Sequence, residues 1–238
     1  MSKVPELSIF FPFWNEEGNI KKVVENAISV AQKVADKWEI IMVDDGSSDK
    51  TLEIANSLAK QNPNLLVKSH KENRGYGAAL KTGFLTSKYQ LVVFNDGDGQ
   101  FDLSEVDKFL EKIKNADVVI GYRKKRLDNP FRHLLMNMLK VWDLLFFNFR
   151  FRDIDCGFKL FSKNSIEKIM PLKSEGAMIT TEILAKAKKN KLKILEVEVN
   201  HYPRMYGDQS GGNLRVILRA IKESLLLWIN LNFNYGRN

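Results

Sequence analysis

Two carboxylates separated by a single glycine form the most chemically suggestive part of the chain. Asp96, Gly97 and Asp98 follow the apolar run at residues 90–94, and Gln100 comes two residues later. Carboxylates at this spacing can share one hard divalent cation, and Mg²⁺ or Mn²⁺ prefers a few carboxylate oxygens together with substrate phosphates. We therefore expect Asp96, Asp98 and Gln100 to bind Mg²⁺ or Mn²⁺, which would neutralise a diphosphate group.

Two further polar clusters each follow an apolar run, at residues 12–17 and 44–49. In an open parallel sheet, ligands bind at the carboxyl ends of the strands, near the point where the strand order reverses. Asp, Gly and Ser are also ordinary turn and helix-capping residues, so each cluster alone has a purely structural explanation. Three such clusters in this order favour a shared ligand site.

The elements that must position these clusters are predicted from apolar periodicity. Over the first 120 residues, short apolar runs alternate with helical patterns, which is typical of parallel βαβ units with right-handed crossovers. Ser104 is the expected cap of the fourth helix. The predicted strands are residues 7–11, 39–43, 65–68, 90–94 and 117–120, and the predicted helices are residues 19–35, 51–60, 76–86 and 104–113.

The pattern changes after residue 121, and we interpret the chain as one α/β domain, residues 1–238. Residues 5–121 would form a nucleotide-binding half, residues 122–212 an acceptor half, and residues 213–238 a C-terminal amphipathic helix. The elements predicted in the second part are a helix at 130–147, a turn and short strand at 153–161, helices at 165–170 and 180–189, a strand at 194–199, a loop at 200–212 and a helix at 214–231.

The bulk properties are those of a basic globular protein. The formal net charge is +8, which favours anionic partners. Nucleic acid is the weaker choice among them, because no recognition motif is present, and we expect none to bind. Cys156 is the single cysteine, so no internal disulfide can form. We expect neither a signal peptide nor a membrane-spanning helix.

These motifs resemble the family 2 inverting glycosyltransferases of the GT-A fold, and the polyprenyl-phosphate branch that includes dolichyl-phosphate mannose synthase. The likeness covers roughly residues 5 to 222. It implies a mostly parallel central sheet flanked by helices, a nucleotide-sugar donor and a divalent metal. The segments that carry it are residues 12–17, 43–49, 73–79, 95–100, 121–123, 153–159 and 202–204, with Gly207 and Ser210.

The resemblance also assigns roles to individual residues. Trp14 stands where the family usually has Tyr, so its contact with a base would be stacking without a hydroxyl. Arg123 and Arg204 would meet phosphates of donor or acceptor. The residues expected to bind the donor are Pro12, Trp14, Glu16, Asp44, Asp45 and Arg123, and those expected to be catalytic are Asp96, Asp98, Arg204, Asp153 and Asp155.

The implied reaction is inverting transfer of a sugar from a GDP- or UDP-linked donor to a polyprenyl phosphate. A first alternative is transfer to a saccharide hydroxyl, for which Asp153 or Asp155 would be the general base. A phosphate acceptor needs no strong base, because a phosphate monoester is mostly ionised near neutral pH. A second alternative is a silent nucleotide-sugar-binding subunit, against which the intact Asp96 and Asp98 argue.

The C-terminal region predicts peripheral membrane association. Apolar residues recur at helical spacing from Leu214 to Trp228, while Arg215, Arg219 and Lys222 lie off that stripe. Such a helix suits an anionic membrane interface. The same stripe would also suit packing on the sheet, a homo-oligomer or a membrane-anchored partner. We expect a cytoplasmic protein that reaches its acceptor at the cytoplasmic membrane face.

Overall fold

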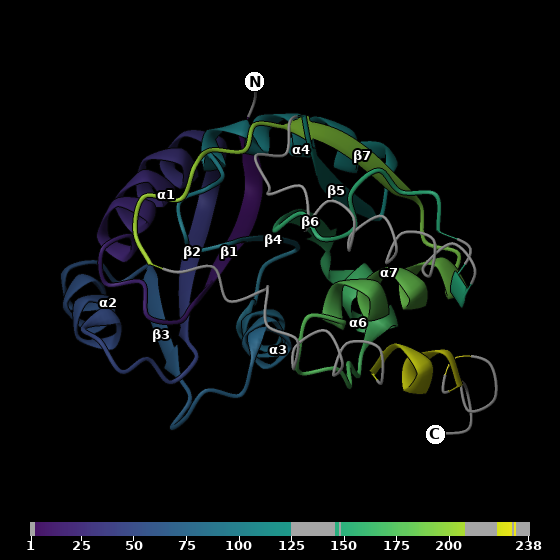
Figure 1. Cartoon of the computed structure of the whole chain (residues 1–238). Coiled ribbons are helices and arrows are strands. Elements are labelled where there is room, and N and C mark those ends of the chain that lie inside the picture. The colour runs from purple at the N-terminus through teal and green to yellow at the C-terminus, as the bar shows by residue number, and fades with distance from the viewer. Residues whose placement is uncertain (1–2, 125–145, 148, 208–222, 230, 232–238) are drawn as a thin grey trace.

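The computed structural model describes residues 3–124, 146–147, 149–207, 223–229 and 231. Within these residues one seven-stranded sheet has the order β3-β2-β1-β4-β6-β5-β7 (Figure 1). Both predicted halves contribute strands to it. The strands are β1 (Val4–Phe13), β2 (Ala35–Asp44), β3 (Leu65–Ser69), β4 (Leu91–Asn95), β5 (Val118–Arg123), β6 (Phe158–Ser162) and β7 (Ile194–Val199).

Most neighbouring strands run parallel, as the sequence predicted. The exception is β6, which pairs antiparallel with both β4 and β5. Because β6 runs in the opposite direction, it begins at the edge of the sheet where β4 and β5 end. The carboxyl ends of β1, β2, β4, β5 and β7 and the start of β6 therefore share one rim.

Helices cover both faces of the sheet. On one face, α1, α2 and α4 enclose a core with β1 and β6, and on the other, α3, α6 and α7 enclose a second core rich in Phe. In Figure 1, α1 and α2 lie toward the β3 end and α6 and α7 toward the opposite end. The helices are α1 (Ile20–Val34), α2 (Thr51–Gln61), α3 (Tyr76–Thr86), α4 (Val106–Lys112), α6 (Lys163–Ile169) and α7 (Ile179–Lys189).

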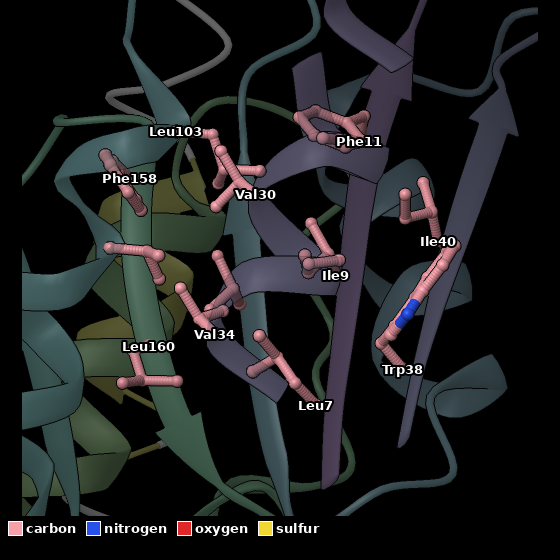
Figure 2. Packing of buried hydrophobic residues seen from close by; sticks show 14 of the residues in the cluster. Leu7, Ile9, Phe11, Val30, Val34, Trp38, Ile40, Leu103, Phe158 and Leu160 are labelled. Carbon is pink, nitrogen blue, oxygen red and sulfur yellow. The ribbon is translucent and has the colours of Figure 1, made fainter. Parts of the chain in front are cut away.

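The first core follows from the periodicity of α1. Ile20, Val24, Ala27 and Ala31 recur at helical spacing and are fully buried. Figure 2 shows Val30 and Val34 of this helix close to side chains of β1 and β6. Burying a Val, Leu or Ile side chain contributes ~1.5–3 kcal/mol, so this packing fixes the strands whose ends form the rim.

One sequence prediction needs correction, and several others lie largely outside the described residues. Ser104 does not cap a helix; the carboxylate of Asp102 accepts a hydrogen bond from the Ser104 amide at 2.9 Å, in a 3₁₀ turn that precedes α4. The predicted helix at 130–147 falls almost entirely outside the described residues, as do residues 208–222 of the predicted loop and C-terminal helix. Among the described residues, no helix has the length and apolarity to cross a membrane.

Candidate functional site: a carboxylate-lined rim

The loop after β1 is joined to the loop after β2 by side-chain hydrogen bonds. The amide of Asn15 donates to the Ser47 hydroxyl at 2.9 Å, and its side-chain oxygen accepts from the Ser48 amide at 2.9 Å. The amide of Glu16 donates to the hydroxyl of Thr51 at 2.8 Å. The predicted donor-binding segments after β1 and β2 therefore form one connected surface.

Asp44 and Asp45 are both buried, but their partners differ. Asp44 accepts hydrogen bonds from the Ser69 hydroxyl at 3.0 Å and from the Ser47 amide at 3.3 Å. Asp45 pairs with Nδ1 of His70 at 2.6 Å, and it also accepts the amides of Arg74 and Gly75 at 3.1 and 2.8 Å. Asp45 thus holds the entry to α3 in place, whereas Asp44 has the weaker internal bonding of the two.

Pro12 and Trp14 occupy the end of β1 and the start of its loop. Pro12 is half-buried, and Trp14 is 45% exposed. An exposed indole on a fixed loop offers a flat apolar face on which a base can stack. This placement is compatible with the predicted role of Trp14.

The Asp96 carboxylate is enclosed at the end of β4. The Tyr76 hydroxyl donates to Asp96 Oδ1 at 2.7 Å, and a Cβ atom on Gly157 would lie 1.8 Å from Asp96 Oδ2. Burial raises the pKa of Asp96, the charge of Asp98 raises it further, and nearby cations lower it in part, to a final value of about 6. The ionised pair therefore carries negative charge that the protein only partly compensates.

Asp98 lies next to the side chain of Arg204, which comes from the loop after β7. Arg204 Nη1 is 3.4 Å from Asp98 Oδ2, and Arg204 Nη2 pairs with Glu16. Burial raises the pKa of Glu16, although hydrogen bonds from Asn19 and Arg204 oppose this effect. The guanidinium of Arg204 thus connects the loop after β1 to the carboxylates after β4.

Gln100 ties the Arg204 loop to the same rim. Its amide nitrogen donates to the Tyr202 carbonyl at 3.0 Å, and its backbone carbonyl accepts from the Tyr202 amide at 2.9 Å. The predicted metal ligand is therefore also part of the support for the loop that carries Arg204.

Arg123 and Asp153 form a buried, two-pronged ion pair. Arg123 Nε and Nη2 donate to the two Asp153 oxygens at 2.6 and 2.9 Å. Asp155, by contrast, is exposed. Sequence reasoning placed Arg123 at a phosphate and either Asp at a base position, but it did not foresee that Arg123 and Asp153 bind each other.

The residues on the rim fit a hard divalent cation. Asp96 and Asp98 supply oxygen ligands whose negative charge the protein only partly compensates, and Gly157 leaves the space that the Asp96 carboxylate occupies. Within the described ranges, no group of three or more His, Cys, Asp or Glu side chains could hold a metal ion. Two carboxylates with a bound diphosphate are the arrangement that Mg²⁺ and Mn²⁺ favour over an all-protein cage.

Sequence reasoning missed two residues beneath the rim. Tyr76 lies in segment 73–79 and begins the predicted helix at 76–86, but no site role was predicted for it, although its hydroxyl reaches Asp96. Lys159 on β6 is fully buried, and its ammonium donates to the Cys156 carbonyl. Burial lowers the pKa of Lys159. The lysine in an otherwise apolar strand was the one sequence signal that could have indicated a buried cation close to Asp96.

A family model places the chain in a class of sugar-transferring enzymes. The model of the glycosyl transferase family 2 matches residues 8–170, which include the clusters after β1, β2 and β4. The chain belongs to glycosyl transferase family 2.

Three relatives are similar to this chain over most of its length. A dolichyl-phosphate β-glucosyltransferase of Saccharomyces cerevisiae is 30% identical over 91% of this chain and 71% of its own length. One from Dictyostelium discoideum is 34% identical over 82% of this chain and 65% of its own length. A dodecaprenyl-phosphate galacturonate synthase of Rhizobium johnstonii is 26% identical over 90% of this chain and 64% of its own length. The chain thus spans about two thirds of the length of these relatives.

Solved structures confirm the GT-A fold. Glucosyl-3-phosphoglycerate synthase of Mycobacterium tuberculosis, in complex with Mn²⁺, UDP and glucosyl-3-phosphoglycerate, has a TM-score of 0.70 and 16% identity. The match covers 95% of this chain and 80% of that protein. Another structure of the same enzyme contains Mg²⁺ and UDP.

Proposed function

We propose that this protein transfers a sugar, with inversion, from a nucleoside-diphosphate sugar to a polyprenyl phosphate. The observation that carries the proposal is the meeting of Glu16, Asp98 and Arg204 from three separate loops at one rim. A carboxylate for a cation and a guanidinium for phosphate oxygens suit a diphosphate leaving group. The names of the relatives, which act on dolichyl or dodecaprenyl phosphate, support the acceptor class.

The donor would lie along the loops after β1 and β2. Trp14 would stack on the base, and Pro12, Glu16 and Asp44 would line the nucleoside. Asp45 would act indirectly, because His70 and two backbone amides already occupy its oxygens. The donor nucleotide is UDP or GDP.

Asp96 and Asp98, with Gln100, would hold Mg²⁺ or Mn²⁺. When bound, the ion neutralises charge on the departing diphosphate. Arg204 would bind a phosphate oxygen through its planar fork. An acceptor phosphate oxygen would form the new bond to the anomeric carbon, while the bond from that carbon to the diphosphate breaks. A single displacement of this kind inverts the configuration.

The state of Asp153 favours a phosphate acceptor over a saccharide hydroxyl. A hydroxyl needs a general base, but both oxygens of Asp153 already accept hydrogen bonds from Arg123. A phosphate arrives already ionised. The reaction would take place at the cytoplasmic face of a membrane.

A transfer assay tests the proposal. Purified protein is incubated with radiolabelled UDP-glucose or GDP-mannose, a polyprenyl phosphate or a saccharide, and either Mn²⁺ or EDTA. We expect label in the organic phase only with the lipid phosphate and a divalent ion. Thermal-shift measurements with UDP and GDP identify the nucleotide, because a ligand that binds only the folded state raises the melting temperature.

Other outcomes would separate the alternatives. Label transferred only to the saccharide would replace the lipid acceptor with a hydroxyl acceptor. Binding of the nucleotide without transfer or donor hydrolysis would indicate a silent binding subunit.

A further inference from the structure

We infer that Tyr76 is a positioning residue that holds Asp96 in the orientation needed to bind the divalent cation. This inference rests on the proposed function. The Tyr76 hydroxyl donates to Asp96 Oδ1 at 2.7 Å. An ionised carboxylate has about four lone-pair sites, so this bond leaves Asp96 free to bind a cation as well. The hydrogen bond restricts rotation of the carboxylate and still leaves lone pairs available to bind a cation.

The backbone on both sides of Tyr76 is fixed by separate elements. The Gly75 amide donates to Asp45 at 2.8 Å, and the Gly77 amide donates to the Glu175 carbonyl at 2.8 Å. Gly75 has φ of +102°, a conformation that glycine adopts without strain. A Cβ on Gly77 would lie 2.7 Å from the Ser174 carbonyl oxygen, so the glycine allows this close approach. The tyrosine therefore extends from an anchored helix start.

Asp96 is restrained from its other sides as well. Its amide donates to the Gly157 carbonyl at 2.9 Å, and Gly157 supplies the space for the carboxylate. Because the hydrogen bond to the residue before β6 holds the Asp96 backbone, the main remaining motion is rotation of the Asp96 side chain. The hydrogen bond from Tyr76 restricts that rotation. Groups that orient a metal ligand in this way typically affect metal affinity about 10–100-fold.

Replacement of the hydroxyl alone tests the inference. Tyr76→Phe keeps the ring, which packs against the second core, and removes only the donor. Mn²⁺ is titrated by calorimetry into full-length protein with UDP or GDP, whichever gives the wild type the larger Mn²⁺-dependent rise in melting temperature. We expect Mn²⁺ to bind about tenfold more weakly to Tyr76→Phe. The melting temperature without metal and nucleotide should change little.

Tyr89→Phe is the matched control. Tyr89 precedes β4, at the edge of the sheet opposite the rim, and the variant should bind Mn²⁺ like the wild type. Wild-type Mn²⁺ affinity in Tyr76→Phe would overturn the inference and leave the proposed function intact. An equal loss in both variants would also overturn it, because the effect would then not depend on Asp96. A wild type that binds no Mn²⁺ would instead overturn the metal part of the proposed function, and this inference with it.

Discussion

Asp98 divides its carboxylate between its own loop and a distant arginine. One oxygen accepts the Gln100 amide at 3.0 Å, and the other lies 3.4 Å from Arg204. The first contact fixes the rotamer, and the second is long enough for a cation or a phosphate to alter it. We therefore expect Asp98, more than Asp96, to respond directly to bound substrate.

Asp98→Ala should abolish turnover and leave the fold intact, because it removes a proposed metal ligand from a half-buried loop and not a side chain from either core. The measurement is turnover in saturating Mn²⁺ together with the melting temperature without ligand. Asp107→Ala, which removes a carboxylate from α4, is the control and should be fully active. Full activity of Asp98→Ala, or of the wild type in excess EDTA, would refute the metal-based proposal.

Arg204→Ala should reduce turnover at least about tenfold, since a lost charge-assisted hydrogen bond costs ~1.5–3 kcal/mol. Arg204→Lys keeps the charge without the planar fork, and its turnover should lie between those of the wild type and Arg204→Ala. Steady-state kinetics with varied donor and acceptor measure the effect. Lys21→Ala, which removes an exposed cation from α1, is the control. Unchanged turnover and unchanged substrate affinity in Arg204→Ala would show that Arg204 takes no part in substrate binding or catalysis.

Residue roles were predicted from sequence where they depend on local spacing. Asp96 and Asp98 follow a strand and stand two positions apart, so their shared rim was readable. The Arg123–Asp153 pair joins residues 30 positions apart, and the Tyr76–Asp96 bond joins residues 20 apart. No periodicity relates such partners, so only the fold brings them together.

The direction of β6 could not be predicted at the level of elements. Phe158–Phe161 is a continuous buried run, like those of the parallel strands. A central strand is buried on both faces whether it runs parallel or antiparallel to its neighbours, so the apolar pattern does not indicate its direction. Helix and strand types were predictable because their periods differ, and their ends moved by a few residues where tertiary packing extended them.

Helix α7 supports the start of α3 through one buried acid. Glu182 accepts hydrogen bonds from the amides of Lys173 and Ser174 at 2.9 and 2.7 Å, and it pairs with Lys186 at 2.8 Å. The adjoining Glu175 carbonyl binds the Gly77 amide. A continuous series of hydrogen bonds and backbone segments therefore connects α7 to the start of α3, where Tyr76 lies.

Glu182→Gln should destabilise the protein near neutral pH by at least ~1.5 kcal/mol, because charge-assisted hydrogen bonds are lost. Burial opposes ionisation of Glu182, but the bonds from Lys186 and the amides outweigh it and lower its pKa below the usual 4.5. The stabilisation is therefore fully present above about pH 4.5 and is lost as pH falls through the lower folded-state pKa. Melting temperatures of variant and wild type should converge in acid. A difference that does not depend on pH would contradict this origin.

At the scale of the whole molecule, an apolar surface lies near the C-terminal end of the described chain. Residues 223–229 are helical; Leu227 is buried in the second core, whereas Leu225, Leu226 and Ile229 are 40–50% exposed. The predicted stripe placed Leu225 and Trp228 on one face, but Trp228 packs edge-on against Phe146 at 5.8 Å. Packing on the protein and an outward apolar face therefore coexist in one helical turn.

Membrane association through this outward face is a prediction. The 238-residue chain, with net charge +8, should sediment with anionic vesicles at low salt. Replacing Leu225, Leu226 and Ile229 together by Ser should sharply reduce the bound fraction, because their apolar burial is lost. Leu85→Ser removes an apolar side chain from α3 that is 74% exposed, more than any of the three, and should change nothing. Equal sedimentation of the triple variant and wild type would exclude this face as the anchor, and light scattering without vesicles would test self-association.

The place of β6 between β4 and β5 has a consequence for synthesis of the chain. A nascent chain that has emerged only to Arg123 has β4 open on one side and β5 without either neighbour. Open strand edges template association with other chains. The next 39 residues, from 124 to Ser162, must follow before the gap closes, which takes on the order of 2–8 s at a rate of about 5–20 residues per second. Ribosome-associated chaperones should therefore bind during this interval, and a premature stop within it should give an insoluble fragment.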